Sequence, residues 1–255
     1  MPAYCNQGDA VHTQLEKGIA FFCKKYPAQQ YMAYFQSYSN TYASVDKLKR
    51  LYEDALSLTG IKGLIISTRP DCLSNEVLEL LSSLSKHHYI KVELGLESTS
   101  EKSLERINRC HTWDDSLDAI VNLDRIGIPI GAHFILGLPG ETYEDMMSHA
   151  SVINTLPVQS VKLHQLQIIR HTSLARSYES QPENIRIFEL DSYIETVIDF
   201  IEKLRPDIMI ERFGSEAPDK LLIAPKWGLK NFELIHKIEK RMDERDTLQG
   251  RLYSL

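Results

Sequence analysis

Polar side chains follow the apolar segments of this sequence at the points where the strands of a sheet are expected to end. Carboxylates, imidazoles and amides in such places transfer protons or bind polar ligands. Buried parallel strands normally read as continuous Val, Ile and Leu, so polar residues at five such ends favour one shared polar pocket over scattered structural roles. The strand-end residues are Gln36, Ser67, Thr68, Arg69, Glu93, Glu97, His133, Gly137, His164, Gln165 and Arg212.

Common catalytic and metal-binding motifs are absent from the sequence. The turn Gly137-Leu138-Pro139-Gly140 has neither the GxGxxG spacing of dinucleotide-binding proteins nor the GKS or GKT of a P-loop. No Ser-His-Asp arrangement or nucleophile elbow is present. Successive cysteines are 18, 49 and 38 residues apart, which excludes a CxxC metal-binding motif and predicts free thiols in a reducing compartment. The four cysteines are Cys5, Cys23, Cys72 and Cys110.

Strands and helices alternate along the chain and must position these polar ends. Strands are predicted over residues 31–38, 63–68, 89–96, 130–136, 160–169 and 207–213. Helices are predicted over 9–26, 45–59, 75–86, 101–108, 113–126, from about 142, and over 174–180, 191–204 and 231–251. Repeated β-then-α units predict an α/β fold with a parallel sheet and right-handed crossovers.

Two architectures fit this alternation, a complete or partial βα barrel and an open doubly wound sheet. In both, ligands bind at the carboxyl ends of the strands. No low-complexity linker divides the 255 residues, so a single domain is predicted.

Composition narrows the class of protein. Hydrophobic residues make up 43% and charged residues 25%, as in globular proteins. The net charge of −6 gives no overall attraction to nucleic acid, and the basic residues near the carboxyl end alternate with acidic ones, so nucleic-acid binding is unsupported. No apolar run is long enough to span a bilayer and no signal peptide is visible, which predicts a cytoplasmic protein without a membrane partner.

Two segments in this order resemble the radical S-adenosylmethionine (SAM) superfamily: ELGLESTSEKSLERINRCHT, followed by GAHFILGLPGET. The closest resemblance is to the branch of oxygen-independent coproporphyrinogen III oxidase and the elongator-type proteins. Further segments resemble a bacterial subgroup of Fe–S oxidoreductases of the YhcC type: YFQSYSNTYA, STRPDCL, KLHQLQ, IERF and APKWGLKNF. The resemblance runs from about Cys5 to Arg241.

The resemblance implies a partial or full βα barrel that binds SAM and a [4Fe–4S] cluster. In this family a CxxxCxxC motif holds the cluster through three cysteines and leaves one iron for SAM. An external electron donor reduces the cluster, and SAM is cleaved to a 5′-deoxyadenosyl radical that abstracts hydrogen from substrate. The implied domain is a single radical SAM core over 1–255, with barrel units over 1–205 and a C-terminal strand and helical extension over 206–255.

The family also implies roles for particular residues. Glu97 would face SAM, and Arg109 would bind the methionine carboxylate with its guanidinium fork. His133 would lie near the ribose hydroxyls, while Gln36 and Ser37 replace the stretch that holds the SAM amino group. Residues bordering the adenine would be Gly137, Leu138, Gln165 and Leu166. The whole predicted cofactor-binding set is Gln36, Ser37, Ser67, Thr68, Glu97, Ser98, Arg109, His133, Gly137, Leu138, Gln165 and Leu166. No catalytic residue and no metal ligand is assigned.

The sequence departs from the family in one respect. The CxxxCxxC motif is absent, and Cys5 has no cysteine three residues before it or four after it. We therefore expect a fragment that lacks the first strand and the cluster loop, with an α/β fold in the form of a partial, TIM-like barrel. Such a fragment would hold no cluster, would bind SAM weakly and would be inactive by itself, with no cofactor bound.

Two other functions fit the same residues. A natural cluster-free relative would keep the barrel as a binding module for a nucleoside-like or peptide ligand. An ordinary βα-barrel lyase or isomerase would use Glu93, His133 or His164 in acid–base chemistry. The sequence identifies neither the substrate nor the oligomeric state.

Overall fold

The computed structural model describes residues 8–26 and 29–254. The chain divides into two compact units. Unit 1 comprises Met1–Leu94 and Val121–Ile130, and unit 2 comprises Gly95–Ile120 and Gly131–Leu255. The prediction of a single domain over 1–255, with barrel units over about 1–205 and a C-terminal extension over 206–255, stays a prediction.

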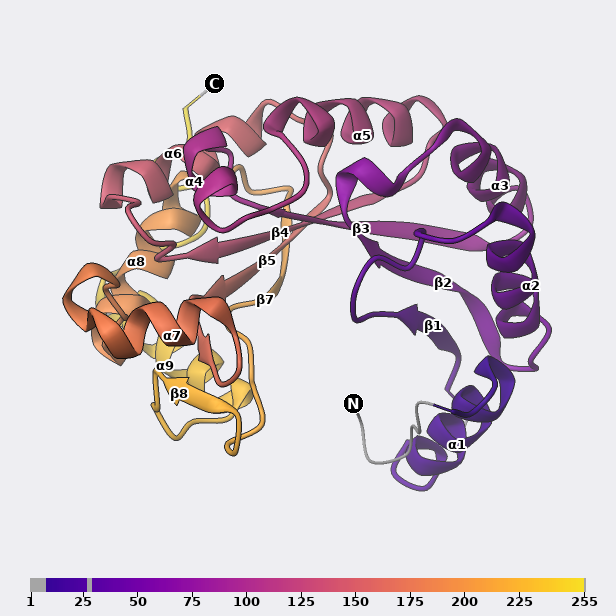
Figure 1. The fold of residues 1–255 in the computed structure, drawn as a ribbon, viewed down its shortest axis with the longest axis horizontal. Coiled ribbons are helices and arrows are strands. Elements are labelled where there is room, and N and C mark those ends of the chain that lie inside the picture. The colour runs from indigo at the N-terminus through magenta and orange to yellow at the C-terminus, as the bar shows by residue number, and fades with distance from the viewer. Residues whose placement is uncertain (1–7, 27–28, 255) are drawn as a thin grey trace. The chain divides into compact units, whose positions relative to one another are not determined.

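Unit 1 is built on parallel strands with helices packed against them. Ser67 pairs with Glu93, which brings the polar ends of two strands together. Its strands are β1 (Tyr31–Phe35), β2 (Ile61–Thr68) and β3 (Tyr89–Glu97), and its helices are α1 (Val11–Cys23), α2 (Val45–Leu56) and α3 (Asn75–Ser85). A 3-10 turn, η1 (Pro70–Cys72), follows β2. Figure 1 shows α2 and α3 side by side on one face of these strands.

The helix α2 forms where its apolar residues recur at helical spacing. Leu48, Tyr52 and Ala55 are all buried, and they lie four and three residues apart on one face. The start of α3 is fixed by Ser74, whose hydroxyl accepts a hydrogen bond from the backbone N–H of Val77.

Unit 2 repeats this plan with further strands. Along β4, residues Ile130, Ala132, Phe134 and Leu136 are buried while His133 is only half-buried, so one face of the strand carries the core. The parallel strands are β4 (Ile130–Leu136), β5 (Ser160–Gln165) and β7 (Met209–Arg212). The helices are α4 (Glu101–Arg106), α6 (Tyr143–Asn154), α7 (Ser173–Ser180), α8 (Leu190–Lys203) and α9 (Asn231–Glu244), with a 3-10 turn η2 (Pro182–Asn184). The helix α5 (Trp113–Arg125) begins in unit 2, and its residues from Val121 on belong to unit 1.

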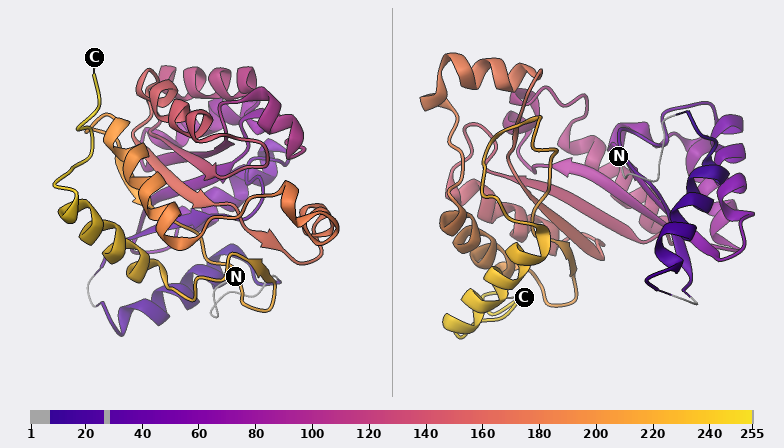
Figure 2. Two further views of the ribbon diagram at one scale, coloured as in Figure 1. Left: turned by 90° about the vertical axis from the view of Figure 1, so that its left-hand side faces the viewer. Right: turned by 90° about the horizontal axis from the view of Figure 1, so that it is seen from below.

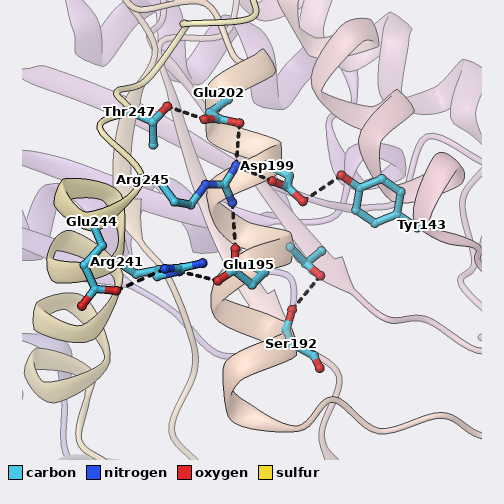
Figure 3. A network of polar contacts seen from close by, with 10 residues as sticks. Tyr143, Ser192, Glu195, Asp199, Glu202, Arg241, Glu244, Arg245 and Thr247 are labelled. Atoms are coloured by element: carbon cyan, nitrogen blue, oxygen red, sulfur yellow. Dashed lines mark hydrogen bonds and ion pairs between the residues drawn. The ribbon is translucent and has the colours of Figure 1, made fainter.

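The last helix is attached to unit 2 largely by charge. Figure 2 shows α9 beside α8, and only Leu234 and Ile238 of α9 are buried. Arg245, just after α9, donates hydrogen bonds of 2.8–2.9 Å to three carboxylates of α8, as Figure 3 shows. Those carboxylates belong to Glu195, Asp199 and Glu202.

The structure corrects two predicted elements. The strand expected over 160–169 ends at Gln165, one residue before the last backbone N–H that donates to β4, that of Leu166 to the Leu136 carbonyl. The side chain of Gln167 donates instead to the carbonyl of Ser215. Ile168–Ile169 forms a separate strand, β6, which pairs antiparallel with the unpredicted β8 (Leu222–Ala224). The helix expected to reach residue 251 ends at Glu244, since Asp246 takes a left-handed conformation with φ of 48°.

The predicted fold class is confirmed. The sheet order is β1-β2-β3-β4-β5-β7, and the strand pairs described within each unit are parallel in that sheet. Within the described residues, no helix is long and apolar enough to cross a membrane.

Candidate functional site

A tight turn at the end of β3 places Glu97 in unit 2. Glu97 has a left-handed backbone, with φ of 67°, although it is not a glycine. The backbone N–H of Ser98 donates to the carbonyl oxygen of Leu96 at 2.9 Å, which closes the turn around Glu97.

Arg109 meets this turn from the end of α4. Asn108 ends the helix in a left-handed conformation, and the N–H of Arg109 returns to the carbonyl of Leu104 at 2.9 Å. Its Nη2 then lies 2.9 Å from Oε1 of Glu97 and donates to the Gly95 carbonyl at 2.8 Å. The structure thus brings Glu97, which was expected to face SAM, to Arg109, which was expected to bind the methionine carboxylate.

Gly95 is required by this arrangement. A β-carbon at that position would lie 2.7 Å from Nη2 of Arg109 and 2.8 Å from Oε1 of Glu97. Any side chain there would push the ion pair away from the strand.

The charges of this pair are partly withdrawn from water. The side chains of Glu97 and Arg109 are 15% and 26% exposed. Burial raises the pKa of the Glu97 carboxyl, while the Arg109 guanidinium and the His133 imidazole oppose that rise. Within the described part of the chain, Nε of Arg109 is buried and makes no hydrogen bond. An unused buried donor on a guanidinium suits a carboxylate ligand.

His133 and His164 come from the neighbouring strands β4 and β5. Ile135 pairs with His164 in the parallel ladder, and the two imidazole rings have centroids 5.5 Å apart. Both residues are half-buried.

The turn after β4 is closed by an aromatic ring. Gly137 has φ of +87°, and a β-carbon there would lie 2.7 Å from the ring of Phe188. Leu138 and Leu166, each of which was expected to border the adenine, belong to one apolar cluster with Ile168, Ala175 and Ile185. Phe188 was missed because its contact with Gly137 is set by the fold.

Gln165 makes contacts that the sequence did not indicate. Its side-chain Nε2 donates to the carbonyl oxygen of Ser215 at 2.9 Å, and its Oε1 accepts from the N–H of the same residue at 2.9 Å. The amide therefore holds the backbone that follows β7.

Unit 1 holds the remaining predicted residues. Gln36 and Ser37 are exposed after β1, and Ser37 has φ of 72°. Asn40, which was not predicted, donates from its side chain to the carbonyl oxygens of Ser37 at 3.3 Å and Ser67 at 2.9 Å. The loop is thereby fixed to the end of β2.

A second polar group lies at the ends of β1, β2 and β3. Glu93 accepts hydrogen bonds from the hydroxyl groups of Tyr34 at 2.6 Å and Ser67 at 3.1 Å. The hydroxyl of Thr68 instead contacts that of Thr41 at 2.6 Å and is buried. Unit 1 thus brings Ser67 to Glu93 and turns Thr68 toward the core.

The described cysteines do not suit an iron–sulfur cluster. Cys23 and Cys110 are exposed and Cys72 is buried, while Cys5 lies outside the described residues. Among residues 8–26 and 29–254, no three His, Cys, Asp or Glu side chains gather in a metal-binding group. SAM itself suits the residues present, since Arg109 offers the buried donor and Gly137 adjoins an apolar cluster.

Comparisons with known proteins show the family to which the chain is similar. The sequence model of the Radical SAM superfamily matches residues 23–153, and that of the Radical_SAM C-terminal domain matches residues 158–244. The uncharacterised protein YtqA of Bacillus subtilis is 32% identical over 97% of this chain and 76% of its own length. The protein YhcC of Escherichia coli is 31% identical over 85% of this chain and 70% of its own length.

A solved structure supports the architecture. Elp3 of the archaeon Methanocaldococcus infernus, with residues 1–46 deleted, matches with a TM-score of 0.81 and 17% identity. The match covers 94% of this chain and 60% of that one. It shows the fold, a partial βα barrel of the TIM type.

Proposed function

Because the chain belongs to the radical SAM superfamily, we propose that it is the SAM-binding core of an enzyme that reductively cleaves SAM. The pairing of Arg109 with Glu97, which leaves a buried guanidinium donor unused, carries the proposal. With its cluster bound, the cofactor of this superfamily supplies a 5′-deoxyadenosyl radical that abstracts hydrogen from an organic substrate. An external electron donor would serve the whole protein.

Arg109 would bind the carboxylate of SAM. Nη2 already donates to the Gly95 carbonyl and contacts Glu97, so Nε is the buried guanidinium donor that a carboxylate ligand would accept from. Glu97 would fix the orientation of that guanidinium through the 2.9 Å ion pair. His133, on the neighbouring strand, would contact the ribose hydroxyls.

The adenine would lie against the apolar cluster of unit 2. Leu138 and Leu166 belong to this cluster, and the ring of Phe188 lies where a β-carbon of Gly137 would be. Gln165 would act indirectly by holding Ser215. In unit 1, Gln36 and Ser37 would receive the SAM amino group. Ser98, Ser67 and Thr68 would support these contacts.

The cluster itself requires ligands that the described residues do not supply. We propose that the 255-residue chain, when produced alone, assembles no cluster and cleaves no SAM. After anaerobic reconstitution with iron and sulfide, its visible absorption should match that of a sample treated with iron alone. A stable cluster signal would contradict this part of the proposal.

Ligand binding tests the SAM site directly. We expect calorimetry to show weak binding of SAM and S-adenosylhomocysteine, with about tenfold lower affinity for methylthioadenosine, which lacks the carboxylate. Equal affinity for all three would contradict recognition of the amino-acid part and favour a cluster-free nucleoside-binding module.

A further inference from the structure

The turn that carries Glu97 is strained. A hydrogen bond from residue 98 to residue 96 around a positive φ is a rare type of γ-turn, and Glu97 has a β-carbon that disfavours it. Such a conformation persists only where the surroundings impose it. The residues that impose it here follow directly in the sequence.

Ser98 and Thr99 are anchored to α6 and the turn before it. The hydroxyl of Ser98 donates to Oε1 of Glu141 at 2.6 Å and accepts from the N–H of Ser100 at 3.0 Å. The hydroxyl of Thr99 lies 2.8 Å from Nδ1 of His149. Two consecutive side chains after the strained residue are thus held by groups more than forty positions away in the sequence.

Glu141 and His149 form a buried unit. Nε2 of His149 lies 3.5 Å from Oε1 of Glu141, and both side chains are 1% exposed. The ring of Phe134 stacks on the imidazole at 5.6 Å. A carboxylate so far from water needs hydrogen-bond partners, and Ser98 supplies one. Neither Glu141 nor His149 is among the residues proposed to touch SAM.

We propose that Glu141 and His149 are positioning residues for the SAM carboxylate. They hold Ser98 and Thr99, which keeps the turn in its strained form and keeps the Glu97 carboxylate on Arg109. The Arg109 guanidinium is then already oriented when the SAM carboxylate binds, so binding costs less side-chain conformational entropy. This inference rests on the proposed role of Arg109.

Replacing Ser98 with alanine isolates the effect, because it removes one hydroxyl and leaves both Glu141, in the turn before α6, and His149, on α6, unchanged. We expect Ser98→Ala to weaken SAM binding about tenfold and to leave methylthioadenosine binding unchanged. The matched control is Ser148→Ala on α6, whose exposed hydroxyl contacts only its own helix at the Asp145 carbonyl among the interactions described. It should change neither affinity.

Two substitutions of Glu141, one conservative and one not, give a second test. Glu141→Gln retains an oxygen that accepts from Ser98, so it should keep most of the preference for SAM over methylthioadenosine. Glu141→Ala should lose that preference by about the same factor as Ser98→Ala. Equal weakening of both ligands in Ser98→Ala, with a lower melting temperature, would mean that the hydroxyl only stabilises the fold and would overturn the inference.

A measurement on the ligand-free protein separates the positioning role of Glu141 and His149 from the assignment of Arg109 to the SAM carboxylate. The Nε–H of Arg109 should give a slowly exchanging resonance in nitrogen-15 NMR, and exchange should be about tenfold faster in Ser98→Ala than in the wild type or Ser148→Ala. If exchange is faster but the wild type does not prefer SAM, the positioning holds and the SAM assignment is wrong. If the wild type prefers SAM and exchange is unchanged, the positioning role is wrong.

Discussion

Nη2 of Arg109 donates to the carbonyl oxygen of Gly95 at 2.8 Å. The approach is so close that a β-carbon on residue 95 would lie only 2.7 Å from the same Nη2. The guanidinium is therefore held by the backbone of β3 as well as by Glu97. Its direction is set before a ligand arrives, which is the condition for selective recognition of a carboxylate.

Replacing Arg109 with lysine tests the need for the planar fork. Lysine keeps the charge but presents a single ammonium that cannot donate in the fixed, parallel geometry of a guanidinium. We expect Arg109→Lys to weaken SAM binding about tenfold or more in calorimetry. Arg125→Lys, at the exposed end of α5, is the matched control and should bind like the wild type. Unchanged affinity in Arg109→Lys would remove Arg109 from the site.

The pKa of Glu97 predicts how the stability of the fold depends on pH. Burial raises this pKa above its ordinary value of 4.5, so the folded state holds the proton more tightly than the unfolded chain. The stabilisation that protonated Glu97 gives to the folded state is fully present at pH values below the pKa of Glu97 in the unfolded chain. It is lost as pH rises through the pKa of Glu97 in the folded protein. Relative to Glu97→Gln, the wild type should therefore lose unfolding free energy as pH rises above about 4.5. Urea unfolding of both proteins across this range measures the difference, and a constant difference would contradict the raised pKa.

Gly137→Ala should destabilise unit 2 for two reasons. The left-handed backbone disfavours a β-carbon, and that carbon would overlap the ring of Phe188, so we expect a loss of about 2 to 4 kcal/mol. Gly228→Ala is the control, since Gly228 has φ of +68° and open space around it. It should cost only about 1 to 2 kcal/mol. Addition of Phe188→Leu to Gly137→Ala should recover part of the loss in urea unfolding.

Arg245 should matter more to stability than Arg241, although both contact Glu195. The side chain of Arg245 is 22% exposed and also binds Glu202, which is 7% exposed, whereas Arg241 and Glu195 are each about two-fifths exposed. We expect Arg245→Met to cost about 2 kcal/mol, because it strands nearby carboxylates. Arg241→Met should cost clearly less than Arg245→Met, because its contacts lie in water. Equal losses in urea unfolding would show that the buried carboxylates find other partners.

The parts of the fold that depend on local pattern could be predicted from the sequence. Alternating burial in β4 and the helical spacing of Leu48, Tyr52 and Ala55 follow from neighbouring residues, so the α/β class and most element positions were correct. The strand β8 was missed because three residues give too short a pattern to recognise.

The side-chain contacts of the site depend on residues that are distant in the sequence. The family resemblance placed Glu97 and Arg109 against the same ligand, but it did not indicate that the two side chains pair with each other. Ser98 meets Glu141 across 43 residues, and Gln165 meets Ser215 across 50. No spacing rule predicts such partners, since the register of the sheet and the packing of the helices create them.

The cluster of charges between α8 and α9 also sets a practical boundary for shortened versions of this protein. A polypeptide that stops after Lys203 would keep Glu195, Asp199 and Glu202 on one helix but lose the guanidinium that neutralises them. The repulsion among three carboxylates would then favour unwinding of a helix that also supplies core residues such as Phe200. The shortest version that expresses well should therefore extend beyond Thr247, whose hydroxyl completes the contacts of Glu202.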